Sequence, residues 1–155
     1  MIVDGRTEFV GGADGQARQA ISRAAQVPKA AVQLQWAQNT AIAGAAIALR
    51  IEVESLGQVN GGDTAEVFLA ITEDNLHSDV KRGENAGRSL DHIGVVRELI
   101  RIGKANSQAA PAFSAQRVVT LLPAWRRENL RAVVFVQGSH SRRVRGAASI
   151  PVAAQ

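Results

Sequence analysis

Ser89, Asp91 and His92 lie within four consecutive residues and are the side-chain types of a hydrolytic triad. In a triad the imidazole takes a proton from the serine hydroxyl, and the carboxylate orients the imidazole. The three groups usually come from distant segments, and this chain has no Gly-x-Ser-x-Gly nucleophile elbow. We therefore interpret Ser89–His92 as a polar turn entering the next element, and we assign no catalytic residue.

Oxygen and imidazole side chains that suit a metal ion occur in Glu73–Asp79, which includes His77. An EF-hand loop needs Asp or Asn at alternating positions, then Gly and a distal Glu, and this spacing is absent. A zinc site would need further His or Cys, but the chain has three His and no Cys. The stretch is predicted to be a solvated loop after a strand, with no metal and no cofactor.

Glycines and cations occur together in Gly83–Arg88, which follows Lys81 and Arg82. Guanidinium groups bind phosphate and carboxylate through paired hydrogen bonds, so an anion is one ligand that this stretch could hold. The stretch lacks both the Walker pattern and the GxGxxG spacing. A structural loop is therefore the preferred interpretation, and anion binding is the alternative.

Further cations, Arg142, Arg143 and Arg145, follow a strand candidate. Together with the net charge of +4, they raise the hypothesis of a nucleic-acid partner. The chain has four Phe, two Trp and no Tyr, so the aromatic platforms on which bases stack are scarce. Arginine at a hairpin end also keeps a sheet edge soluble, and we prefer this interpretation.

The absence of cysteine excludes disulfides, thiolate catalysis and Cys-ligated metals. A length of 155 residues suits one domain, or one domain with a small appendage. No apolar run approaches the ~20 residues that a membrane helix needs. No secretory signal is recognised, so this chain as written is expected to stay in the cytoplasm.

The elements that would position these side chains begin with a hairpin. Asp4-Gly5 stands between the β-prone runs Ile2–Val3 and Thr7–Val10. Such a turn needs positive φ, which glycine adopts without strain, so the pattern strongly favours a hairpin. The exposed edge of this hairpin is expected to allow self-association, because a lone hairpin is marginally stable in water.

A helix is predicted to follow the hairpin, capped by Asp14 and running to about Gln26 before Pro28. Its apolar residues are spaced to share one face: Ala17, Ala20, Ile21, Ala24 and Ala25. Residues 1–27 are therefore predicted to form a β-β-α unit.

Alternation of apolar and polar residues predicts a series of strands in the rest of the chain. They are residues 32–36, 47–53, 67–71, 118–122, 130–137 and 144–152. Asn60–Asp63 is predicted to be a turn, and Ala105–Ser114 a loop. Short strands separated by turns favour a mainly β fold, an Ig-like or jelly-roll-like antiparallel sandwich. The pattern of Ile93–Ile102 fits a helix or a strand, and propensity does not decide.

Three stretches carry a resemblance to a known bacterial family: MIVDGRTEFVGG, ITEDNLHSDVKRGENAGRSLDHIGVVREL and LRAVVFVQGSHSRRVRGAASIPV. Over nearly its whole length the chain resembles the second half of the thioredoxin-like domain-of-unknown-function family 1223. The run Arg82–Arg88, with His92 and Val95–Arg97 behind it, is fairly specific to that family.

The resemblance implies an exported protein, periplasmic or secreted, with two parts. A thioredoxin-like domain with a Cys-x-x-Cys motif and a cis-proline loop precedes a β-rich part. The segment Ile2–Val10 is implied to follow the cis-proline loop directly. Residues 1–28 are therefore expected to be the β-β-α remnant of that domain in a truncated chain, and residues 29–155 the β-sandwich domain. The resemblance also implies a strand at Ile93–Ile102.

The leading functional hypothesis is a non-catalytic accessory or binding module of a thioredoxin-like protein. Its partner would be an unidentified protein or a small ligand. The candidate ligand residues are Arg82, Glu84, Asn85, Arg88, Asp91, His92 and Arg97. A structural role is preferred even for these, as charge-assisted hydrogen bonds that hold the long loop.

Two alternatives come from other functional classes. In one, the chain is the C-terminal half of an exported thiol–disulfide oxidoreductase whose Cys-x-x-Cys lies upstream of Met1. No redox residue has a matching position here, and thiol–disulfide exchange needs a thiolate. In the other, the chain is a basic nucleic-acid-binding module, which predicts binding that weakens steeply with salt.

Overall fold

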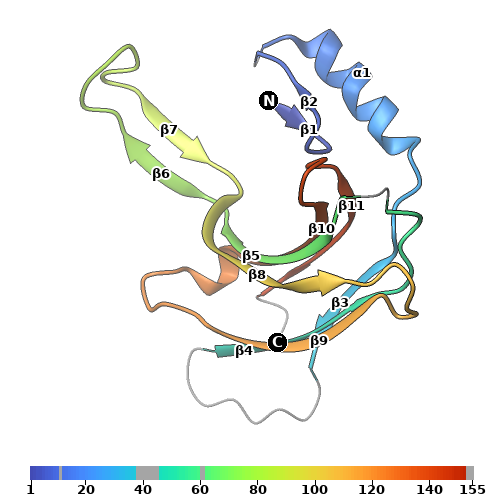
Figure 1. The fold of residues 1–155 in the computed structure, drawn as a ribbon. Helices are drawn as coiled ribbons and strands as arrows, with labels where there is room; N and C mark the ends of the chain where they lie inside the picture. Colours follow the sequence, from blue (N-terminus) through green and yellow to red (C-terminus); the bar gives the residue numbers. More distant parts are fainter. Residues whose placement is uncertain (11, 38–45, 60–61, 153–155) are drawn as a thin grey trace.

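The computed structural model describes residues 1–10, 12–37, 46–59 and 62–152. Two antiparallel sheets stack on one another, and two small hairpins and one helix stand outside them (Figure 1). Neither sheet closes into a barrel within the described part. The predicted mainly β, sandwich-like fold is confirmed.

The larger sheet has four strands in the order β11-β10-β5-β8. Their bounds are Ala65–Glu73 for β5, Val95–Ala105 for β8, Leu130–Gly138 for β10 and Val144–Pro151 for β11. β5 and β10 pair without a register shift, from Glu73 opposite Leu130 to Ala65 opposite Gly138. The ambiguous stretch Ile93–Ile102 is therefore mostly strand, as the family resemblance implies.

The smaller sheet has three strands in the order β3-β4-β9, and it supplies the second layer. Their bounds are Val32–Trp36 for β3, Ala46–Val53 for β4 and Phe113–Thr120 for β9. β9 begins earlier than the strand predicted at 118–122, so the preceding loop is shorter than expected. Of the turn predicted at Asn60–Asp63, residues 60–61 lie outside the described residues.

The hydrophobic core lies between the two sheets. It is made of the inward residues of β4, β5 and β10: Ile47, Leu49, Ile51, Val53, Val67, Leu69, Ile71, Ala132, Val134 and Val136. Burying each of the larger aliphatic side chains stabilises the fold by about 1.5–3 kcal/mol. The alternation seen in the sequence therefore identifies the inner faces correctly.

The outer faces of the two sheets differ in polarity. On the smaller sheet, the outward positions are largely polar: Gln33, Gln35, Arg50, Glu52 and Gln116. On the larger sheet, the outward positions of β5 and β10 include Phe68, Ala70, Val133 and Phe135. The rings of Phe68 and Phe135 stack with their centroids 5.2 Å apart. Strands that are apolar on both faces are typical of sheets covered on both sides.

A two-stranded arm extends the β5–β8 pair away from the sandwich (Figure 1). It consists of β6 (Leu76–Asp79) and β7 (Ser89–His92). The predicted polar turn at Ser89–His92 and the predicted loop at Glu73–Asp79 are therefore wrong. Both stretches are short and polar, so the propensity of either one alone does not indicate a strand. Most of each is a strand because the two pair across the hairpin.

The N-terminal hairpin is confirmed, with β1 (Ile2–Val3) antiparallel to β2 (Thr7–Glu8). Asp4 and Gly5 have φ of 57° and 70°, as the predicted turn requires. Together with helix α1, these strands form the hairpin–helix unit, residues 1–10 and 12–27.

Helix α1 (Asp14–Ala25) lies on the hairpin and matches the predicted range closely. The predicted cap is wrong: Asp14 is the first helical residue, and Ala13 precedes it with no side-chain cap. Only Ala20 of the predicted apolar face is buried, because the helix has just two short strands to cover. A 3-10 turn, η1 (Arg127–Asn129), precedes β10. No helix in the described ranges could cross a membrane.

Candidate functional site

The loop at the far end of the arm holds four of the residues that the sequence analysis singled out. Arg82, Glu84, Asn85 and Arg88 are all exposed there. Backbone hydrogen bonds close the loop, from Val80 N to Arg88 O (2.9 Å) and from Arg88 N to Asn85 O (3.0 Å). Within the described residues, the charged side chains of the loop form no ion pair. The expected charge-assisted bonds therefore do not hold this loop.

His77 of β6 lies between two carboxylates on one face of the arm. Its Nδ1 is 2.9 Å from Asp91 Oδ1, and its Nε2 is 3.5 Å from Asp79 Oδ1. The Ser89 hydroxyl bonds both to His77 Nε2 and to Asp79 Oδ1, the latter at 2.5 Å. The structure therefore gives Asp91 a histidine partner from the opposite strand.

Ser89, His77 and Asp91 have the hydrogen-bond connectivity of a hydrolytic triad, with His77 where the sequence analysis considered His92. The hydrogen bond with Asp91 raises the pKa of His77 above its usual value, and the charge of Asp79 adds to this shift. A raised pKa leaves a smaller fraction of the imidazole neutral at a given pH, and the protonated ring cannot accept the serine proton. Asp79 also competes for the Ser89 hydroxyl. The network is therefore better suited to fastening the two strands than to catalysis.

The opposite face of the arm carries His92, which hydrogen-bonds to Ser78 at 2.5 Å between Nε2 and Oγ. The predicted pair of site residues, Asp91 and His92, thus point to opposite faces of one ribbon. They do not act on a common ligand.

A pH titration tests the geometry around His77. We expect its imidazole to titrate above the ordinary pKa of about 6.5, and Asp91→Asn to lower that pKa. A raised folded-state pKa means that the contribution of His77 to arm stability is complete below about pH 6.5 and is lost as the pH rises through the folded pKa. NMR of the imidazole Cε1 proton measures the pKa of His77 in both proteins. The same titration curve in the variant would contradict the contact.

Arg97, the last of the predicted site residues, lies at the base of the arm and pairs with Glu73. Its Nε is 2.6 Å from Glu73 Oε2, and the backbone N–H of Arg126 donates to Glu73 Oε1 at 3.0 Å. Burial favours the neutral acid, but these hydrogen bonds outweigh it and hold the pKa of Glu73 below its usual value. The seven predicted residues therefore lie at the tip, middle and base of the arm and form no single site.

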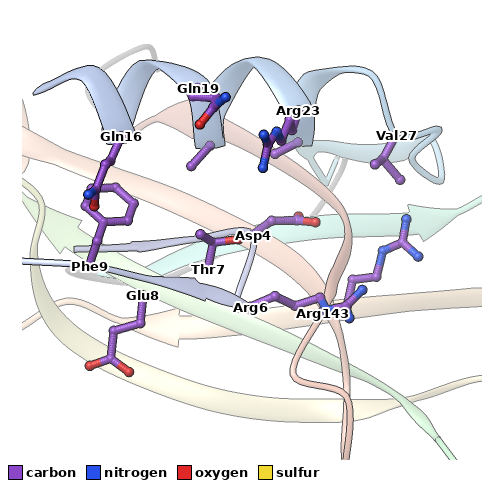
Figure 2. Close-up of a pocket in the computed structure, with 12 residues that line it drawn as sticks. Asp4, Arg6, Thr7, Glu8, Phe9, Gln16, Gln19, Arg23, Val27 and Arg143 are labelled. Carbon is purple, nitrogen blue, oxygen red and sulfur yellow. The ribbon is translucent and has the colours of Figure 1, made fainter. Parts of the chain in front are cut away.

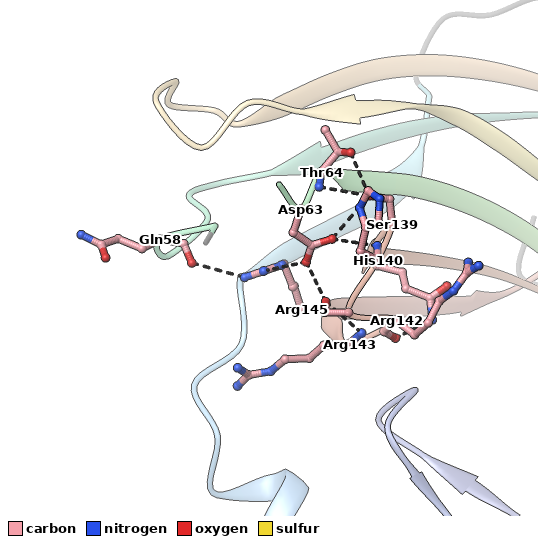
Figure 3. Close-up of polar contacts among 10 residues, drawn as sticks. Gln58, Asp63, Thr64, Ser139, His140, Arg142, Arg143 and Arg145 are labelled. Atoms are coloured by element: carbon pink, nitrogen blue, oxygen red, sulfur yellow. Dashed lines mark hydrogen bonds and ion pairs between the residues drawn. The ribbon is translucent and has the colours of Figure 1, made fainter. Parts of the chain in front are cut away.

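A cluster that the sequence analysis missed surrounds Asp63, just before β5 (Figure 3). Its carboxylate accepts hydrogen bonds from Ser141 Oγ (2.6 Å), His140 N (3.0 Å) and Arg145 Nη2 (3.3 Å). The Ser141 hydroxyl, followed by the His140 N–H, holds the pKa of Asp63 far below its usual range. These partners are about eighty positions away in the chain, so no local signal reveals them. The cluster fixes the β10–β11 turn.

The hairpin–helix unit docks end-on against this same turn. Val144 N donates to Asp4 O at 3.1 Å, and Lys29 Nζ bonds both to the Asp4 carboxylate and to Val144 O. Gly5 is in close contact with Arg142 O, where an added Cβ would lie 1.9 Å from that oxygen. The two turns therefore hold each other in place.

Two adjoining hollows, each of about 570 Å³, meet where the turns join. Arg6 and Arg143 line both of them. One hollow lies between the hairpin and α1, and Figure 2 shows Arg6 reaching from the hairpin toward Arg143. The other lies beside Asp63 and His140. We take this arginine junction, Arg6 with Arg143, as the candidate binding site.

The two hollows have different walls. The one under α1 has an apolar wall, formed by Phe9, Ala20, Ala24 and Val27. The one beside Asp63 is lined mostly by polar and charged residues. In the described ranges, no group of three or more His, Asp or Glu side chains is placed to hold a metal ion.

A family model described as protein of unknown function (DUF1223) matches residues 1–137. No curated protein and no solved structure matched. The matched range includes the hairpin–helix unit, the arm and most of the sandwich.

Proposed function

The chain belongs to the family described as protein of unknown function (DUF1223), and we propose that it is a non-catalytic module that docks a thioredoxin-like domain. The observation that carries the proposal is the apolar outer face of the larger sheet. Phe68, Phe135 and Val133, each half-buried, occupy its centre, and Leu99 of β8 is 56% exposed beside them. Large exposed apolar patches are typical of protein-binding surfaces.

The neighbours of this face support a protein partner. The hairpin–helix unit and the arm both stand on the outer side of the larger sheet and flank it (Figure 1). The hairpin itself has exposed apolar side chains, with Ile2 at 65% and Val10 at 82%. A partner seated between the two flanks would cover the face and these side chains together.

The hairpin supports a thioredoxin-like partner in particular. In the described part, β1 and β2 pair only with each other, so each strand has an unpaired edge. An unpaired edge continues a sheet through main-chain hydrogen bonds when another strand is added. The sequence resemblance implies that this β-β-α unit is the end of a thioredoxin-like domain, which supports such a partner. The partner would then supply the remaining strands, and any thiol chemistry would belong to it, because this chain has no cysteine.

Adding a lysine to the outer face of one sheet or the other tests the proposal. A tagged chain is purified from its native host, and the bound proteins are identified by mass spectrometry. We expect a protein with a thioredoxin-like domain to accompany the wild type and the control Gln35→Lys, which changes the polar outer face of the smaller sheet. Val133→Lys should abolish that association, because a lysine on the apolar face cannot be buried without a partner charge. Equal recovery with all three proteins would contradict the proposal.

A further inference from the structure

We infer that the arginine junction binds the phosphate group of a small phosphate monoester. The fold places both side chains on the walls of the same two hollows, and Figure 2 shows Arg6 reaching toward Arg143. Arg6 follows the β1–β2 turn and Arg143 ends the β10–β11 turn, and the contacts of Asp4, Lys29 and Val144 lock the two turns. Like charges that line one hollow repel each other, and an anion bound in the hollow offsets that repulsion.

The charges around the hollow under α1 favour a ligand with two negative charges. Its charged residues are Asp4, Arg6, Glu8, Arg23 and Arg143. Asp4 already pairs with Lys29, so Glu8 is the one carboxylate left to oppose three arginines. An excess of two positive charges remains.

The hollow beside Asp63 has the same excess. Arg6, Arg143 and Arg145 are its arginines, and Asp63 is its carboxylate. Asp63 already accepts hydrogen bonds from Arg145 and the β10–β11 turn, so it does not neutralise the junction. A phosphate monoester carries close to two negative charges near neutral pH and accepts paired hydrogen bonds from guanidinium groups.

The apolar wall under α1 indicates the rest of the ligand. Ala24 and Val27 line the hollow from the helix segment, and Phe9 lines it from the hairpin. In Figure 2, Val27 lies on the same side as Arg143, and Phe9 lies at the other end of the hollow. A volume of about 570 Å³ lies within the range of small-ligand sites. An apolar or aromatic group esterified to the phosphate would lie against this wall while the phosphate contacts the junction.

The experiment is an NMR titration of the full chain, observing the arginine Nε–Hε signals. The probes are phenyl phosphate, inorganic phosphate and benzoate, at constant ionic strength and about pH 7.5, where the monoester is close to a dianion. We expect phenyl phosphate to bind at least about tenfold more tightly than benzoate, with inorganic phosphate between them. The signals of Arg6 and Arg143 should shift most.

Matched variants decide whether the junction is the site. Arg6→Ala and Arg143→Ala should each weaken phenyl phosphate binding by about tenfold or more. Arg18→Ala removes the same charge from an exposed position of α1 outside the hollow and should change binding by less than about twofold. Equal losses in all three variants, or equal affinity for phenyl phosphate and benzoate, would overturn the inference. Tighter binding of a short single-stranded DNA that weakens steeply with salt would overturn it as well, in favour of a nucleic-acid partner.

Discussion

Replacing Glu73 with alanine is expected to lower the free energy of unfolding by about 2–3 kcal/mol. The Glu73 side chain is 1% exposed, and it accepts hydrogen bonds from the Arg97 guanidinium and the Arg126 N–H. Its removal leaves two buried or half-buried donors without an acceptor, which is costly. The value lies below that of a fully enclosed ion pair because Arg97 is 30% exposed and water can solvate part of it. Urea unfolding of both proteins measures the difference.

Glu66→Ala provides the matched control for this prediction. Glu66 lies on the same strand, β5, and also pairs with an arginine of β8, Arg101, at 2.9 Å. That pair is more exposed, so its removal is expected to cost about 1 kcal/mol or less. Equal losses of unfolding free energy in Glu73→Ala and Glu66→Ala would contradict the claim that burial makes the Glu73 pair the more stabilising one.

The effect of Glu73 should also depend on pH. Its folded-state pKa is lowered, so its contribution to stability is present above the unfolded pKa of about 4.3 and is lost as the pH falls through the folded value. The difference in the free energy of unfolding between wild type and Glu73→Ala should therefore become smaller when unfolding is measured at successively lower pH. A gap that widens toward low pH would mean that the folded protein holds Glu73 as a neutral acid.

Gly5→Ala is expected to release the hairpin–helix unit from the sandwich. The new Cβ would lie 1.9 Å from the backbone oxygen of Arg142, which cannot move without breaking the β10–β11 turn. The φ of 70° at Gly5 adds a cost of about 1 kcal/mol for any residue with a side chain. Because the unit buries little of its own surface, α1 should lose helicity once undocked. Circular dichroism and amide hydrogen exchange of residues 1–27 measure this loss.

Gly94→Ala is the control that distinguishes the steric clash at Gly5 from the cost of a side chain at positive φ. Gly94 has nearly the same φ, 67°, and an added Cβ there would meet no atom within 4 Å. We expect this variant to lose about 1 kcal/mol and to keep the helical signal of α1. Helicity that survives in Gly5→Ala as well would contradict the docking of the two turns.

The sequence predicts the sandwich because its central strands have a clear period of two. β4 alternates so regularly that Ile47, Leu49, Ile51 and Val53 are all recognised as one buried face. The same rule locates β10 within a residue at its C-terminal end. Where an element depends on a partner strand, the rule fails. β6 and β7 are short and polar. They are strands because they pair with each other beyond the end of the β5–β8 pair.

The candidate site was harder to predict, for a related reason. Residues close together in the chain, such as Arg82 and Arg88, suggest a site, yet they lie at an exposed tip and line neither hollow of the arginine junction. Arg6 and Arg143 come from opposite ends of the chain, and they line the same two hollows because two turns are in contact. Both turns are recognisable in the sequence, but their contact is a property of the tertiary fold.

Photo-cross-linking in the native host tests the docking proposal most directly. Benzoylphenylalanine replaces Phe135 on the apolar outer face, or Gln35 on the polar outer face as the control. We expect irradiation to join position 135, but not position 35, to a peptide of a thioredoxin-like domain. Three results would contradict the account: no cross-link from position 135, a cross-link only to a second copy of this chain, or capture of the same proteins from positions 135 and 35.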